Sequence, residues 1–246
     1  MKTLKRIIPI LLVVLAVFSL VGCKKKGKDK SVDELNNALN NTVQEFKAAQ
    51  NVQAKITLTS TDTQTIDVKY SIENNKIKAL ATVLKDTNGE VSVYVKDGVC
   101  YIARYNSVKE KYTATDAELQ KIAESYTLDA YIKKALDIFN KEFFKASSAE
   151  KLSDSSYKLT CDLASLQVSD DTPDDEILDA EAQIEKLQAM ESVTLTLTLS
   201  GDAISVLEGT FVKEGKTSTI KIEFLNKDSF TVEVPNQSEY VEKSNN

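Results

Sequence analysis

The fold is decided by residues 52–105, VQAKITLTSTDTQTIDVKYSIENNKIKALATVLKDTNGEVSVYVKDGVCYIARY. Apolar side chains alternate with polar ones in five runs, the pattern typical of strands that bury one face. The runs are residues 52–58, 66–72, 77–83, 91–95 and 99–105. Turn residues join them, and Asp97-Gly98 is the clearest case, because a two-residue hairpin loop needs positive φ angles that Gly and Asp tolerate. The stretch predicts an antiparallel meander with one apolar face.

On both sides of this meander the apolar spacing changes to that of amphipathic helices. Residues 31–50 begin with Ser31 and Glu34 in a capping box and continue as one apolar stripe. Further helices are expected at residues 115–126, 129–145 and 173–190. Alternating strands are expected at residues 156–163, 193–200, 203–212, 217–225 and 229–234.

These elements predict the fold class. About nine or ten antiparallel strands are more than a flat sheet holds comfortably, so we expect an α+β fold with a strongly curled antiparallel sheet, a half-open barrel. The N-terminal helix and a helical lid are expected to cover its concave face. No linker interrupts residues 31–246, which favours a single domain.

The first 23 residues have the pattern of an export signal. Lys2, Lys5 and Arg6 precede an apolar run at residues 7–21, which is short for a transmembrane span. The tetrapeptide Leu20-Val21-Gly22-Cys23 resembles the lipobox of bacterial lipoproteins. The resemblance implies a signal peptide at residues 1–22, cleavage before Cys23 and lipidation of the Cys23 thiol. Residues 23–30 would then form a basic tether to the outer face of the cell membrane.

Composition excludes several functional classes. The 246 residues include no His, which rules out Ser-His-Asp and Cys-His catalysis and His-ligated metals. A net charge of -6 argues against nucleic-acid binding. Abundant Lys and Asn beside few Arg suggest an AT-rich bacterium of Gram-positive type.

No group of residues points to chemistry. Five carboxylates gather at Asp170, Asp171, Asp174, Asp175 and Glu176, but anions in the first turn of a helix explain them better than a metal site. Cys100 and Cys161 are expected to be small buried thiols, although export also permits a disulfide. We therefore expect no catalytic residue, no metal and no cofactor.

The order of elements supplies a second resemblance. A lipobox, an N-terminal helix, a long meander, a helical insertion and a closing meander resemble the lipoprotein-carrier fold of the LolA/LolB carriers and the LppX/LprG-type lipoproteins. That family implies helices that plug a half-open barrel around a cavity for acyl chains. Fold alone does not establish such a function.

The predicted lid is more apolar than one buried face requires, and it lies near the aromatic end of the first meander. Candidate residues for the lining of a ligand cavity are Tyr101, Tyr105, Ile132, Leu136, Phe139 and Phe143. The same side chains are also suited to an ordinary core.

The sequence therefore predicts a non-enzymatic, membrane-anchored lipoprotein that binds or carries a lipid or another hydrophobic small molecule. One alternative is a surface lipoprotein whose core is filled and whose acidic exterior meets a protein partner. A second is the solute-binding component of an importer, although tight hairpins argue against its parallel α/β lobes.

Overall fold

A computed structural model describes residues 30–74, 76–168 and 177–243. Within it, Ser31–Asn246 forms one compact unit. The predicted signal peptide, Cys23 and nearly all of the tether lie outside the described residues. So do the five carboxylates at residues 170–176 and the start of the helix expected at 173–190.

The predicted N-terminal helix is present as α2 (Val32–Ala48). Its capping box forms as expected: the Ser31 amide donates to Glu34 Oε2 (2.7 Å), and the Glu34 amide donates to Ser31 Oγ (3.2 Å). The apolar stripe is buried, with Leu35, Leu39 and Val43 at 6% exposure or less. Spacing of three and four residues therefore placed the buried face correctly.

The first meander contains the five predicted strands and one more. The bounds are β1 (Asn51–Thr59), β2 (Thr63–Glu73), β3 (Lys76–Asp86), β4 (Gly89–Lys96), β5 (Val99–Ala103) and β6 (Glu110–Thr113). Asp97 and Gly98 have φ angles of 53° and 75°, as the predicted hairpin loop requires. Strand β6 was not predicted, because its four residues, three half-buried and one exposed, carry no readable alternation.

The second meander contains β7 (Ser147–Ser153), β8 (Ser156–Cys161), β9 (Ser192–Ser200), β10 (Ala203–Lys213) and β11 (Lys216–Asn226). A short helical turn, η1 (Leu163–Ser165), and the helix α6 (Ile177–Gln188) separate β8 from β9. Strand β7 was not predicted, because its side chains are almost all exposed and follow no apolar period.

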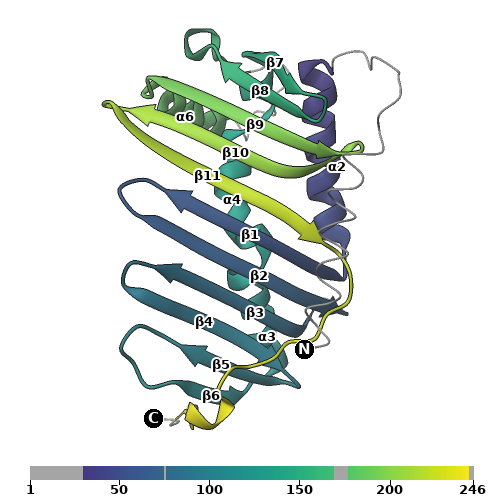
Figure 1. The fold of residues 1–246 in the computed structure, drawn as a ribbon, viewed down its shortest axis with the longest axis vertical. Helices are drawn as coiled ribbons and strands as arrows, with labels where there is room; N and C mark the ends of the chain where they lie inside the picture. The colour runs from purple at the N-terminus through teal and green to yellow at the C-terminus, as the bar shows by residue number, and fades with distance from the viewer. Residues whose placement is uncertain (1–29, 75, 169–176, 244–246) are drawn as a thin grey trace. The chain divides into compact units, whose positions relative to one another are not determined.

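The two meanders join through β1 and β11 into a 12-stranded sheet of order β12-β6-β5-β4-β3-β2-β1-β11-β10-β9-β8-β7 (Figure 1). Every pairing is antiparallel except that of β12 (Val241–Glu242) with β6. The α+β class is thus as expected, but the strongly curled half-open barrel is wrong, since the sheet is neither closed nor strongly curled. Its two edge strands are the two-residue β12 and the polar β7. Edge strands that are short or polar can face solvent, so the sheet does not need to close into a barrel.

The helical cover consists of α3 (Asp116–Tyr126), α4 (Leu128–Ile138) and α5 (Lys141–Lys145), together with α2 and α6. The single helix expected at residues 129–145 is wrong, because the chain bends at Phe139 and Asn140. Asn140 is the N-cap of α5, where its Oδ1 accepts from the Phe143 amide (3.1 Å). An Asn side chain that bonds a nearby amide competes with helix continuation.

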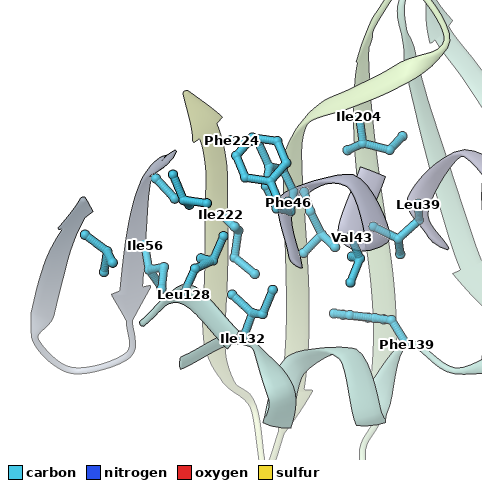
Figure 2. Close-up of a cluster of buried hydrophobic side chains, with 14 of the residues drawn as sticks. Leu39, Val43, Phe46, Ile56, Leu128, Ile132, Phe139, Ile204, Ile222 and Phe224 are labelled. Atoms are coloured by element: carbon cyan, nitrogen blue, oxygen red, sulfur yellow. The ribbon is translucent and has the colours of Figure 1, made fainter. Parts of the chain in front are cut away.

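The main core lies between these helices and one face of the sheet. Figure 2 shows Phe46 of α2 against Phe224 of β11, with ring centres 5.0 Å apart. Leu39, Val43, Ile132, Phe139 and Ile222 belong to the same buried cluster.

The opposite face of the sheet carries a smaller core under the C-terminal strap, which we define as residues 230–240. Val232, Val234 and Tyr240 of the strap are buried against Ala81 of β3 and Tyr94 of β4. The strand expected at residues 229–234 is wrong: this segment has no regular secondary structure and pairs with no described strand. It crosses the sheet (Figure 1) and is held by its side chains, so alternation of its apolar residues did not mean strand pairing.

Candidate functional site

An open pocket of about 550 Å³ lies at one end of the strands, between the end of α4 and the β1–β2 and β3–β4 connections. Both connections lie at the same end of the strands (Figure 1). The volume is within the range of small-molecule sites. This pocket, called the rim pocket below, is the candidate site.

The floor of the rim pocket is apolar. It is formed by Leu58 of β1, Phe211 of β10, Ile220 of β11 and Ile138 of α4, all half-buried and packed against the main core. Leu58 is paired in register with Ile220, which places both on the face that the helices cover. Because side chains alternate between the two faces of each strand, these residues form a continuous apolar surface next to the main core.

The rim is polar and acidic. It consists of residues 59–64 and 86–88 with Ser218 and Thr219. Asp62 and Asp86 bring two carboxylates, and none of the residues lining this pocket is Lys or Arg. The pocket therefore offers an apolar floor beneath a rim whose only formal charges are negative.

Asp86 is held in the β3–β4 turn, where its Oδ1 accepts from the Asn88 amide (2.7 Å). The nearby Tyr105 hydroxyl, and then the turn amides, lower the pKa of Asp86. The Tyr105 hydroxyl is itself enclosed and acts on Asp86 electrostatically, without a hydrogen bond of normal geometry. Asp86 is consequently ionised at neutral pH.

Behind the floor, aromatic rings form a row that leads into the core. Phe211 stacks on Phe139 with ring centres 5.7 Å apart, and Phe139 meets Phe143 edge to face at 5.0 Å. Phe143 in turn meets Phe144 at 5.7 Å. The row begins at the rim pocket and ends at side chains with no more than 2% exposure.

The structure brings together four of the six predicted cavity residues. Ile132, Phe139 and Phe143 are buried in the main core, and half-buried Leu136 packs against it. They fill this space with their own side chains.

Tyr101 and Tyr105 lie elsewhere. Tyr101 points to the opposite face, where its ring meets that of Tyr240 at 5.3 Å. Tyr105 lies in the β5–β6 connection, and its ring is 3.4 Å from where a Cβ on Gly89 would be. None of the six residues lines the rim pocket, although Phe139 contacts Phe211, which does.

Sequence reasoning missed the residues of the rim pocket because they come from five strands, two turns and the end of α4. One signal was present. Gly209 lies inside a strand run rather than at a turn, and a glycine in such a place often marks a close approach by another group.

The described residues offer little for chemistry beyond binding. Cys100 and Cys161 are both free and buried, as expected, and burial raises the pKa of each thiol. No group of three His, Cys, Asp or Glu in the described ranges could hold a metal ion. In the same ranges, no helix is both long and apolar enough to cross a membrane.

The site can therefore hold an apolar group under a polar, negatively charged rim. Comparison with known proteins adds no family to this geometry, because no protein-family model and no curated protein matches the chain.

Proposed function

We propose that this protein is an extracytoplasmic lipoprotein, anchored to the outer face of the cell membrane through Cys23, that binds a hydrophobic ligand without altering it chemically. The observation that carries the proposal is the rim pocket, with its apolar floor and polar rim. The lipobox pattern and the helical cover on one face of an antiparallel sheet support it, as in the lipoprotein carriers that the sequence resembles.

The rim narrows the class of ligand. Asp62 and Asp86 would repel an anionic head group, and no cation lines the pocket to offset them. Hydroxyl and amide groups at residues 59–64 can instead bond an uncharged polar head. We therefore propose an amphiphile with an apolar chain and an uncharged or cationic head.

Photo-crosslinking tests this proposal on the full-length, membrane-anchored protein. The probe is a monoacylglycerol with a diazirine on the chain close to its uncharged head. We expect labelled peptides from the ends of β1, β10 and β11, with competition by unlabelled monoacylglycerol and far less by a fatty acid, which is anionic. Labelling spread evenly over exposed peptides would contradict the proposal.

The anchor is tested separately. Replacing Cys23 by Ala removes the thiol to which the lipid would be attached. We expect loss of metabolic labelling by a palmitate analogue and release of the protein from the membrane fraction, or accumulation of the uncleaved chain. A Cys161→Ala variant is the matched control, because Cys161 is buried and should not affect labelling. Full lipid labelling of the Cys23→Ala variant would refute the anchor.

One observation favours a second function. Ile132, Phe139 and Phe143 fill the space beneath the helices, as expected for a lipoprotein that acts as a protein-interaction or structural module. On that view the rim pocket is only a surface hollow. The photo-crosslinking experiment separates the two functions, since a filled module would show no competed labelling at the pocket.

A further inference from the structure

The contact between Phe139 and Gly209 lies beside the floor of the rim pocket, because Phe139 stacks on Phe211 and Gly209 is paired with Ile220. A Cβ built on Gly209 would lie 2.4 Å from Phe139 Cζ and 2.7 Å from Cε2, far inside contact distance. The ring tip therefore occupies the space that a side chain on this position of β10 would fill. No other residue than Gly permits this approach.

Gly209 is a direct neighbour of the pocket floor. It is paired in register with Ile220 on β11, and it lies two residues before Phe211 on the same face of β10. Two residues of strand span about 7 Å. The Gly209 position thus continues the floor away from the pocket, and the Phe139 ring covers it.

Phe139 is also the residue best placed to move. It follows the last residue of α4 and precedes the N-cap of α5, so neither helix contains its backbone. Its neighbours Phe143 and Phe144 lie within α5, where helical hydrogen bonds restrain them. A turn of the Phe139 side chain would require no unfolding of either helix.

We propose that Phe139 is a movable plug, and that the unbranched chain of a bound amphiphile extends inward over Gly209 when the ring moves aside. The inference rests on the proposed function, because it assigns the inner part of the same site. We call the space over Gly209 the slot; it is filled by the tip of the Phe139 ring, and Ile220 and Phe211 lie beside it. A space of this width suits the methylene groups of one unbranched chain. Phe139 then sets how long a chain the protein accepts.

Two monoacylglycerol probes test the plug on the full-length, membrane-anchored protein. The shallow probe has its diazirine near the head, and the deep probe has it at the chain terminus. In the wild type, we expect the deep probe to label peptides around Gly209 and α5. Phe139→Ala should raise this deep labelling several-fold and leave shallow labelling nearly unchanged.

Gly209→Ala provides the opposite change. Its methyl group would fill the slot and narrow the passage, so deep labelling should fall several-fold while shallow labelling persists. Phe46→Ala is the matched control, because Phe46 packs against Phe224 in the same core but does not line the pocket. It should leave both kinds of labelling close to wild type.

The outcomes are distinct. Shallow labelling without deep labelling in every variant would overturn the plug and leave the proposed function standing. Equal gains in Phe139→Ala and Phe46→Ala would also overturn it, since general loosening of the core would then explain the effect. If unlabelled monoacylglycerol does not reduce labelling of the wild type by the shallow probe, the proposed function and the plug are both refuted.

Discussion

Thr42 shows how a single hydroxyl joins a helix to the sheet. It lies in α2 with 2% exposure, and its Oγ1 accepts from the Ile204 amide of β10 at 2.8 Å. Ile204 is paired with Leu199 of β9, but pairing of β10 with β11 begins only at Val206, so Ile204 lies beyond the β10–β11 ladder. A buried amide without a partner is costly, and the Thr42 hydroxyl satisfies it.

Replacing Thr42 by Val keeps the shape of the side chain and removes the acceptor. We expect the free energy of unfolding to fall by about 1–3 kcal/mol, measured by chemical denaturation. Thr42→Ser is the control, because it keeps the hydroxyl and should lose less. Equal stability of Thr42→Val and the wild type would show that water satisfies the Ile204 amide.

Tyrosine ionisation predicts how stability depends on alkaline pH. Burial, and then the charge of Asp129, raise the pKa of Tyr70 to about 12 from its ordinary value of 10.0. Because the folded state holds the proton more tightly, the stabilisation is fully present below about pH 10 and is lost as pH rises toward 12. The total is roughly 2 to 3 kcal/mol for this group.

Replacing Tyr70 by Phe should therefore flatten the fall in unfolding free energy between pH 10 and 12, the two pKa values of Tyr70. The measurement is a series of denaturant titrations across that interval. Tyr101→Phe serves as the control, since Tyr101 is only half-buried and packs on the opposite face. An unchanged slope in Tyr70→Phe would contradict the assignment.

At the scale of elements, the helix that covers β3 depends on its first turn. The Thr115 amide donates to Glu118 Oε2 (2.8 Å), and the Glu118 amide donates to Thr115 Oγ1 (3.3 Å). These bonds satisfy two amides at the start of α3. The Thr115 amide, and then the Thr115 hydroxyl, donate to Glu118 Oε2 and lower the pKa of Glu118.

Replacing Thr115 by Ala should lower the free energy of unfolding by about 1 kcal/mol, because one amide of α3 loses its acceptor. Chemical denaturation measures the change, and Thr115→Ser should stay within a few tenths of the wild type. A loss equal to that of Thr115→Ala in the Ser variant would point to the Thr115 methyl group instead of the cap.

The bend between α4 and α5 also belongs to this scale. A three-to-four spacing runs without interruption through residues 129–145, so it indicates one helix. The spacing could not reveal that Asn140 would cap a new helix and that Phe143 and Phe144 would both be buried. Those outcomes depend on the neighbouring sheet and on α2, which lie far away in sequence.

For the whole folded unit, the C-terminal strap joins the end of the chain to the first meander. It covers Ala81 and Tyr94, and it ends where the Val241 amide donates to the Lys109 carbonyl (2.9 Å). Lys109 also pairs with Glu239 of the strap. The strap therefore covers the part of this face that β3, β4 and β5 form.

Replacing Val232 by Ser should lower the free energy of unfolding by about 2–3 kcal/mol, since a hydroxyl would replace a buried apolar group. Hydrogen exchange should accelerate most in β3–β5. Glu233→Ser is the matched control, because the adjacent Glu233 is exposed and should change little. Similar effects of both variants would show that the strap contributes no specific packing.

The sequence by itself determined the elements whose signal is local. Alternating strands, tight turns such as Asp97-Gly98 and the Ser31 cap depend on residues close together in the chain. The turn and the cap are found where they were expected, and so are the strands except the one at residues 229–234. The sequence also carried the lipobox at Cys23, which stays a prediction.

Only the tertiary structure decided what depends on distant partners. It determined the open sheet, the path of the strap and the rim pocket, whose floor draws Leu58, Phe211 and Ile220 from three strands. Phe139 and Gly209 are 70 positions apart in the chain. Their contact could not be predicted, because side-chain spacing encodes which face is buried but not which group will cover it.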